Sequence, residues 1–200
     1  MTYAVRSEYT IARCDHAAAV ALVRAHHYAG GAANTSVLSV GAYRAGRMVA
    51  AALWMPPTRV CAESVSPDWQ RVLSLSRLVV VPGEPTNVAS MIIGACLRIL
   101  RREGVWSHLV TYADESQGHT GTIYRATNWT YAGRTKPEPR WIDRHGRQVS
   151  RKSGPVSRTA AEMTALGYVL SGRFSKHKFV LHLRPVSSRR GQFELPGVSS

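Results

Sequence analysis

Apolar and polar positions alternate along most of this chain in short blocks, and the period of each block predicts its secondary structure. Blocks with a period of two that are rich in β-branched and aromatic residues predict strands. Blocks with a period near 3.6 predict amphipathic helices. The predicted strands cover residues 3–14, 36–43, 47–55, 72–81, 108–113, 129–132, 168–170 and 176–183, and the predicted helices cover residues 16–26, 87–103, 118–128 and 159–166.

The residues between these blocks predict where the elements begin and end. Asp15 is a suitable N-cap for the first helix, and Gly104 ends the second one. Arg44-Ala45-Gly46 joins two strands and predicts a hairpin. Residues 72–81 form the strongest strand signal, and their continuously apolar half is typical of a central, buried strand. This order of elements predicts a mixed sheet with helices on both faces.

The candidate chemistry begins where the strand at residues 108–113 ends. Asp114 and Glu115 follow that strand, and the next predicted helix carries Tyr124. A polar loop that leads from the carboxyl end of a strand into a helix is a common ligand position in α/β proteins. We therefore expect Asp114 and Tyr124 to approach each other.

Composition narrows the class of protein. The 200 residues suit one domain with a real core, and no apolar run approaches the roughly 20 residues that a membrane-spanning helix needs. The first residues lack the apolar centre of a signal peptide, so a soluble, intracellular protein is expected. Cys14, Cys61 and Cys96 are odd in number and widely spaced, which argues against a disulfide framework and a cysteine-rich zinc site.

The positive charge is concentrated in the last third of the chain. The net charge is +14, and residues 134–190 hold fourteen Lys or Arg against three acidic residues. Such asymmetry favours a polyanionic partner, first of all double-stranded DNA, although a basic tail can also serve solubility or bind any anion. Residues 134–158 have few apolar positions and predict an extended basic arm, and the tail from about residue 184 is expected to be mobile. The arm side chains expected to contact DNA phosphates are Arg134, Lys136, Arg140, Arg144, Arg147, Arg151 and Lys152, with Trp141 available to stack on a base.

The order of elements resembles the GNAT acyltransferase fold, best between residues 73 and 133, where a long strand, a helix, a strand and a further helix precede the sequence IYRATNWTYAG. In that fold a glycine-rich loop usually holds the cofactor pyrophosphate. The equivalent loop here, residues 81–87, has one glycine and two prolines. The helix start that follows can still offer the backbone N–H groups of Val88, Ala89 and Ser90 to a donor such as acetyl-CoA or another small molecule.

Within this fold, five features in their joint order resemble the phage Mom family. These are the pair His27-Tyr28, the sequence LSRL at residues 75–78, Ala113-Asp114, the tyrosine ten residues later, and the late strand KHKFV. Members of that family convert adenine in DNA to a carbamoylmethyl derivative and so shield phage DNA from restriction. The resemblance implies an iron site at His27, Tyr28 and Asp114, with Tyr124 close by and Arg77 and Ser90 as further site residues. It also implies a cytoplasmic location in an infected or lysogenic bacterial host.

Each of these residues also has a simpler interpretation. A His-Tyr pair commonly ends a helix by packing on its neighbours, and His26 competes with His27 as a ligand. Tyr124 suits a general acid and equally a core residue. Arg77, if its head is buried, needs an anion or a carbonyl as a partner. Ser90 can be an ordinary helix residue, and Trp129 can pack under the last helix instead of meeting a base.

Three hypotheses follow for the function. The first is a DNA hypermodification enzyme that acts on the N6 amine of adenine, which must be extruded or single-stranded to react. The second is an acyl-CoA-dependent N-acetyltransferase on a small amine or a protein. The third is a non-catalytic DNA-binding protein on a GNAT-like scaffold. The sequence leaves the oligomeric state open, and a homodimer is one of the options.

Overall fold

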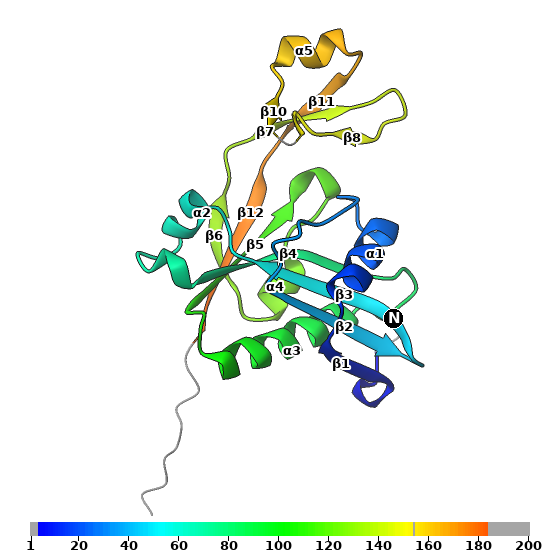
Figure 1. Ribbon diagram of the computed structural model, residues 1–200, viewed down its shortest axis with the longest axis vertical. Coiled ribbons are helices and arrows are strands. Elements are labelled where there is room, and N and C mark those ends of the chain that lie inside the picture. The colour runs from blue at the N-terminus through cyan, green and yellow to red at the C-terminus, as the bar shows by residue number, and fades with distance from the viewer. Residues whose placement is uncertain (1–3, 154, 184–200) are drawn as a thin grey trace, which may run out of the picture.

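The computed structural model describes residues 4–153 and 155–183, and its centre is a seven-stranded sheet (Figure 1). The strand order is β1-β2-β3-β4-β5-β12-β6, and every neighbouring pair is antiparallel except β4 and β5. The mixed, mostly antiparallel sheet expected from the sequence is therefore confirmed. Its strands are β1 (Tyr9–Arg13), β2 (Leu38–Arg44), β3 (Arg47–Met55), β4 (Val72–Val80), β5 (His108–Asp114), β6 (Thr130–Arg134) and β12 (Lys176–His182).

Helices cover both faces of this sheet, as the alternating pattern predicts. On one face α3 (Val88–Glu103) packs Ile92 and Ile93 in a cluster with Ala50, Ala52 and Trp54 of β3. On the other face α1 (His16–His26) packs Val20 and Val23 in a cluster with Ala51 and Leu53 of the same strand. Successive side chains of a strand point to opposite faces, so β3 is buried on both sides.

Local signals account for the boundaries of these elements. The Asp15 side chain accepts a hydrogen bond from the amide of Ala18 at 2.9 Å and so caps α1. The β2–β3 hairpin turns through Ala45 (φ 48°) and Gly46 (φ 76°), and two positive φ angles in succession match the twist that such hairpins need. Gly104 in the left-handed conformation ends α3.

The central strands β4 and β5 separate beyond their first half. They pair in parallel only from Val72–His108 to Leu75–Thr111. The pairing of β4 with β3 is irregular between Leu75 and Arg77, so Ser76 is an extra residue on β4. A bulge of this kind bends the strand. The gap between the diverging halves of β4 and β5 is where the candidate site lies.

The region expected to be an extended basic arm is folded. A three-stranded sheet, in the order β11-β7-β8, carries a short helix and stands beyond the end of β5 (Figure 1). We call residues 138–174 the basic subdomain. Its elements are β7 (Glu138–Ile142), β8 (Gln148–Val149), β9 (Lys152–Ser153), β10 (Val156–Ser157), α5 (Ala160–Ala165) and β11 (Val169–Phe174).

Trp141 differs from expectation because β7 is the middle strand of this small sheet. It pairs with Leu170 of β11 and Val149 of β8, and only 5% of its surface is exposed. A ring enclosed in this way is not available to stack on a base. The sequence does not reveal the strand because Pro139 and the charged neighbours hide its period, and its partner β11 lies some thirty residues away.

The helix expected over residues 118–128 is also shorter than predicted. Only α4 (Thr122–Ala126) is helical, and residues 118–121 form a loop in which Gly118 and Gly121 have positive φ angles. Gly121 is required there, because a Cβ at this position would overlap the ring of Phe179. The remaining short elements are α2 (Arg59–Glu63) and three 3₁₀ helices at Arg6–Glu8, Trp69–Arg71 and Glu115–Gln117.

Two further expectations concern the membrane and the tail. Within residues 4–153 and 155–183, no helix is both long and apolar enough to cross a membrane. The tail expected to be mobile, from about residue 184, lies outside the described residues.

Candidate active site

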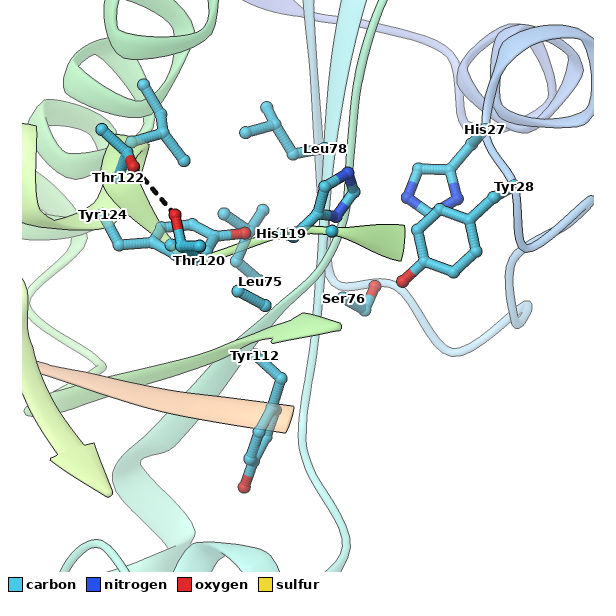
Figure 2. A pocket seen from close by; sticks show the side chains of 14 residues that line it. His27, Tyr28, Leu75, Ser76, Leu78, Tyr112, His119, Thr120, Thr122 and Tyr124 are labelled. Carbon is cyan, nitrogen blue, oxygen red and sulfur yellow. Dashed lines mark hydrogen bonds between the residues drawn. The ribbon is translucent and has the colours of Figure 1, made fainter. Parts of the chain in front are cut away.

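A cavity of about 360 Å³ lies between the diverging halves of β4 and β5. Strand β4 contributes its bulge, strand β5 its carboxyl end, and the glycine-rich loop before α4 forms a further wall. The loop after α1 closes the remaining side (Figure 2). The lining residues are His27, Tyr28, Leu75, Ser76, Leu78, Tyr112, Ala113, Gly118, His119, Thr120, Gly121, Thr122, Ile123 and Tyr124.

His27 and Tyr28 enter this cavity because α1 ends immediately before them. The backbone of His27 is extended, and the two rings stack with their centroids 4.4 Å apart. The Ala29 amide donates to Nδ1 of His27 at 3.1 Å, so the proton of the neutral ring lies on Nε2. Burial, together with the positive charges of Arg77 and His119, lowers the pKa of His27 to about 4. His27 therefore presents an uncharged N–H donor at neutral pH.

The phenol of Tyr28 lies within electrostatic reach of Asp114. Partial burial and the negative charge of Asp114 raise the pKa of Tyr28, while Arg77 opposes the shift. Tyr28 is 46% exposed, and its ring meets that of His119 edge-on, with centroids 5.8 Å apart. The loop after α1 and the end of β5, more than eighty residues apart in sequence, thus meet at one cavity.

Asp114 is buried at the tip of β5, with 8% of its surface exposed. Its carboxylate accepts a hydrogen bond from the Ser116 amide at 2.9 Å, which begins the turn at Glu115–Gln117. Its backbone carbonyl accepts from the His119 amide at 3.2 Å. Asp114 therefore shapes the loop that carries His119 into the cavity.

Tyr124 lies on the inner side of α4 and is 8% exposed. Its ring contacts those of Phe179 and Trp129, with centroid distances of 5.3 and 5.8 Å. Burial raises the pKa of Tyr124, and a hydrogen bond with Thr111 offsets part of that rise. The residue is both a core ring and a cavity residue, and its phenol stays protonated at neutral pH.

Arg77 and Ser90 do not line the cavity. The Arg77 guanidinium donates to the carbonyls of Gly31 and Ser76 at 2.8 and 2.7 Å, and so ties the loop after α1 to the β4 bulge. This is the carbonyl partner that a half-buried arginine needs. Ser90 donates its hydroxyl to the carbonyl of Asn87 at 2.8 Å within the first turn of α3.

The start of α3 offers fewer free donors than expected. The Val88 amide is taken by the Pro85 carbonyl at 3.1 Å. Among the described residues, the amides of Ala89 and Ser90 have no hydrogen-bond acceptor. Asn87 does not cap the helix with its side chain but binds the backbone of Ala4, at 2.7 Å to the amide and 3.1 Å to the carbonyl.

Two of the three side chains expected to hold iron are partly engaged by backbone amides. Nδ1 of His27 and one carboxylate oxygen of Asp114 already accept hydrogen bonds from backbone amides. Over the part of the chain that the structure describes, no three His, Cys, Asp or Glu side chains are grouped so that they could hold a metal ion. The described residues therefore give no support for the iron expected from the resemblance, and His27, Tyr28 and Asp114 as its ligands stay a prediction.

The basic residues expected to contact DNA fall into two groups. Arg134 pairs with Glu115, Arg140 donates to the Ser116 carbonyl, Arg147 pairs with Asp143, and Arg151 donates to the Arg158 carbonyl. These four already have partners within the protein. The second group consists of the exposed residues Lys136, Arg144 and Lys152. The Arg144 guanidinium donates to Nε2 of the neighbouring His145 at 3.0 Å.

Two contributors to the site are not among the site residues predicted from the sequence. The first is His119, which only the β5–α4 loop brings opposite Tyr28. Ser76 lies at the bulge of β4, which depends on the register between β3 and β4. The LSRL sequence at residues 75–78 was the one available signal for Ser76, and the Gly-His-Thr-Gly sequence at residues 118–121 was the signal for His119.

A family comparison identifies this arrangement. The model of the Mom protein family matches residues 8–195. The chain belongs to the Mom protein family. The match spans the residues of both the cavity and the basic subdomain. No curated protein sequence is significantly similar to it.

Solved structures show that this member of the Mom family has the GNAT fold. The ribosomal-protein-S18-alanine N-acetyltransferase from Escherichia coli has a TM-score of 0.55 at 12% identity, with 90% of this chain and 97% of that chain covered. An N-acetyltransferase from Staphylococcus aureus Mu50 has a TM-score of 0.56 at 12% identity, with 88% and 99% covered. A GNAT family acetyltransferase from Elizabethkingia anophelis with acetyl-CoA bound has a TM-score of 0.55 at 9% identity, with 89% and 100% covered. At such identities the likeness establishes the fold alone.

Proposed function

We propose that this protein is a DNA-modifying transferase that attaches a small group, of the carbamoylmethyl type, to the N6 amine of adenine and so protects phage DNA from restriction. The observation that carries the proposal is the position of the cavity. It opens between the diverging strands β4 and β5, next to the turn at Glu115–Gln117 that the basic subdomain contacts through Arg140. A cleft for small-molecule chemistry and a surface for a polyanion thus lie side by side.

Two groups in the cavity suit a transfer to an amine. The amine must lose a proton as it forms its new bond, and the leaving group of the donor must gain one. Tyr124 keeps its proton at neutral pH and can donate it to the leaving group. Nε2–H of His27 can hold a carbonyl oxygen of the donor, and the imidazole of His119, which lines the same cavity, can take up the proton of the amine. The proposal assigns no step to a metal.

The donor is expected at the start of α3. The amides of Ala89 and Ser90 lie in the first turn of this helix, and a helix N-terminus binds phosphate groups favourably. A structural neighbour of this chain binds acetyl-CoA, which supports acetyl-CoA or a related small molecule as the donor. The loop before α3 contains a single glycine, so it offers a smaller phosphate cradle than a glycine-rich loop does.

The acceptor base has to leave the DNA helix to reach Tyr124. A cavity of about 360 Å³ is of the size that small ligands occupy in proteins, which suits one extruded base rather than a duplex. The exposed cations Lys136, Arg144 and Lys152 would contact phosphates around it.

Mass spectrometry of nucleosides from cellular DNA tests this proposal. Cells that express the protein, grown with ample iron so that a metal requirement does not mask the activity, should contain a modified deoxyadenosine. The modification should be absent from cells that express the folded Tyr124→Phe variant. Unmodified deoxyadenosine in cells with soluble wild-type protein would contradict the proposal.

A second candidate function is an acyl-CoA-dependent N-acetyltransferase on a small amine or a protein. The fold and the two free amides at the start of α3 favour it. Turnover of acetyl-CoA with an amine acceptor in the complete absence of DNA would favour this function over DNA modification.

If the protein only binds DNA and catalyses no reaction, the cavity residues are not needed for its function. Its salt-dependent DNA binding should be unchanged in a His27→Ala, Asp114→Ala double variant, and neither DNA nor an amine should be modified.

A further inference from the structure

Several contacts join the basic subdomain and its connecting strands to one turn at the cavity. This turn, Glu115–Gln117, directly follows Asp114 and precedes the loop that lines the cavity. Figure 1 shows the subdomain standing beyond the end of β5, where this turn lies. The side-chain contacts come from Arg134 of β6, Arg140 of β7 and His177 of β12, and of these only Arg140 belongs to the basic subdomain.

Glu115 is the acidic residue of this turn. Its carboxylate pairs with Arg134 of β6 and with Nε2 of His177 of β12, the latter at 3.2 Å. The same carboxylate accepts a hydrogen bond from the Ser175 amide at 3.2 Å. With three partners, the Glu115 side chain is confined to one position.

Arg140 is the residue of the basic subdomain that contacts this turn. Its Nη1 donates to the Ser116 carbonyl at 2.9 Å. The amide oxygen of Gln117, when turned toward the guanidinium, accepts from Nη1 and Nη2 at 3.3 Å each. Nε of Arg140 is buried without a partner among the described residues. A planar fork that spans two acceptors fixes a turn more firmly than a single ammonium group can.

Hydrogen bonds to Asp114 connect this turn to the loop that lines the cavity. The Ser116 amide binds the carboxylate of Asp114, and the His119 amide binds the Asp114 carbonyl. His119 and Gly121 of the same loop line the cavity. A shift of the Ser116 carbonyl would therefore move the cavity wall.

We propose that Arg140 is a positioning residue that couples the basic subdomain to residues 115–121 at the cavity, and that it is not a phosphate contact. The inference rests on the proposed function for its effect on activity, while its structural part stands alone. Bending or docking of the subdomain on DNA would act on residues 115–121 through Arg140. The sequence alone places Arg140 among the phosphate ligands.

The test compares Arg140→Gln with two matched variants of the same subdomain. Arg144→Gln removes an exposed cation proposed to contact DNA, and Arg173→Gln removes an exposed arginine of β11 that the proposal does not use. Hydrogen exchange of the amides at residues 116–121 and the salt dependence of DNA binding are measured for each. Arg140→Lys is a second variant in case Arg140→Gln does not fold, because it keeps the charge but not the fork.

We expect exchange at residues 116–121 to be at least about tenfold faster in Arg140→Gln and Arg140→Lys, and unchanged in the other two variants. The slope of log Kobs against log salt should stay at the wild-type value in Arg140→Gln and fall by about one in Arg144→Gln. At saturating DNA, the modification rate should fall about tenfold or more in the Arg140 variants with little change in KM.

Unchanged exchange at residues 116–121 together with a slope reduced by about one in Arg140→Gln would overturn the proposal and make Arg140 a phosphate contact. Hydrogen exchange does not depend on activity. If the wild-type protein modifies no DNA but exchange at residues 116–121 is faster in the Arg140 variants, the positioning role of Arg140 is supported and the proposed function is contradicted.

Discussion

Tyr124 is the residue on which the proposed chemistry depends most directly. Its hydroxyl is the only part that Tyr124→Phe removes, and the ring contacts with Phe179 and Trp129 remain. We expect DNA modification to fall by about 10² to 10⁴, the usual contribution of general acid catalysis. Quantitative mass spectrometry of modified deoxyadenosine checks this expectation.

The control for this variant is Tyr43→Phe. Tyr43 lies on β2 and does not line the cavity, so the same chemical change there should leave the modification rate unaltered. Equal losses in the two variants would show that the Tyr124 hydroxyl has no specific role.

The lowered pKa of His27 predicts how the free energy of unfolding depends on pH. Its pKa in the folded protein is about 4, against 6.5 for an unperturbed histidine. Between these values the unfolded chain binds more protons, so the free energy of unfolding falls as the pH falls from about 6.5 to about 4. His27→Gln should remove this contribution, and the variant should lose less stability over that range than the wild type.

Urea denaturation at about pH 7.5 and about pH 4.5 measures the effect. His145→Gln removes an exposed histidine and should retain the wild-type pH dependence. An identical pH dependence in wild type and His27→Gln would mean that His27 is not buried as the structure describes.

At the scale of elements, the loop between β5 and α4 packs the backbone of Gly121 closely against the ring of Phe179. Gly121→Ala places a methyl group against Phe179, whereas Gly118→Ala, at nearly the same φ angle, meets open space. Both substitutions carry a backbone cost of about 1 kcal/mol, and overpacking should add about 1–3 kcal/mol at Gly121 alone.

Chemical denaturation of the two alanine variants separates these effects. Because Gly118→Ala is matched in backbone conformation, the difference in their free energies of unfolding measures the clash with Phe179. A difference near zero would show that the α4 start can move away from β12 at no cost.

At the scale of the whole molecule, the proposed function predicts that DNA binding depends on the exposed cations of the basic region. Replacing Lys136, Arg144 and Lys152 by Gln should reduce the slope of log Kobs against log salt by about 0.9 for each phosphate that is no longer neutralised. A triple variant at Arg47, Arg98 and Arg102 removes the same charge from exposed positions on β3 and α3. Fluorescence anisotropy with duplex DNA over a range of salt concentrations compares the two.

The second triple variant is expected to keep the wild-type slope. Equal reductions in both would show that binding follows the net charge of +14 rather than the basic subdomain. The folded state of each variant is verified by its unfolding midpoint.

The sequence by itself determined most of the elements, because their signals are local. The apolar period marked α1, α3 and β4, and Asp15 and Gly104 marked two helix boundaries. Positive charge in the last third also identified the basic region. Each of these properties can be evaluated within a window of one element.

Tertiary structure alone decided which residues meet. The enclosure of Trp141 depends on β7 pairing with β11. The Gly31 carbonyl bound by Arg77 and the Ser116 carbonyl bound by Arg140 lie 46 and 24 residues away from them in the chain. His119 became a cavity residue because the end of β5 diverges from β4 and turns back over the gap. Contacts of this kind depend on strand register and on the path of loops, which no local period encodes.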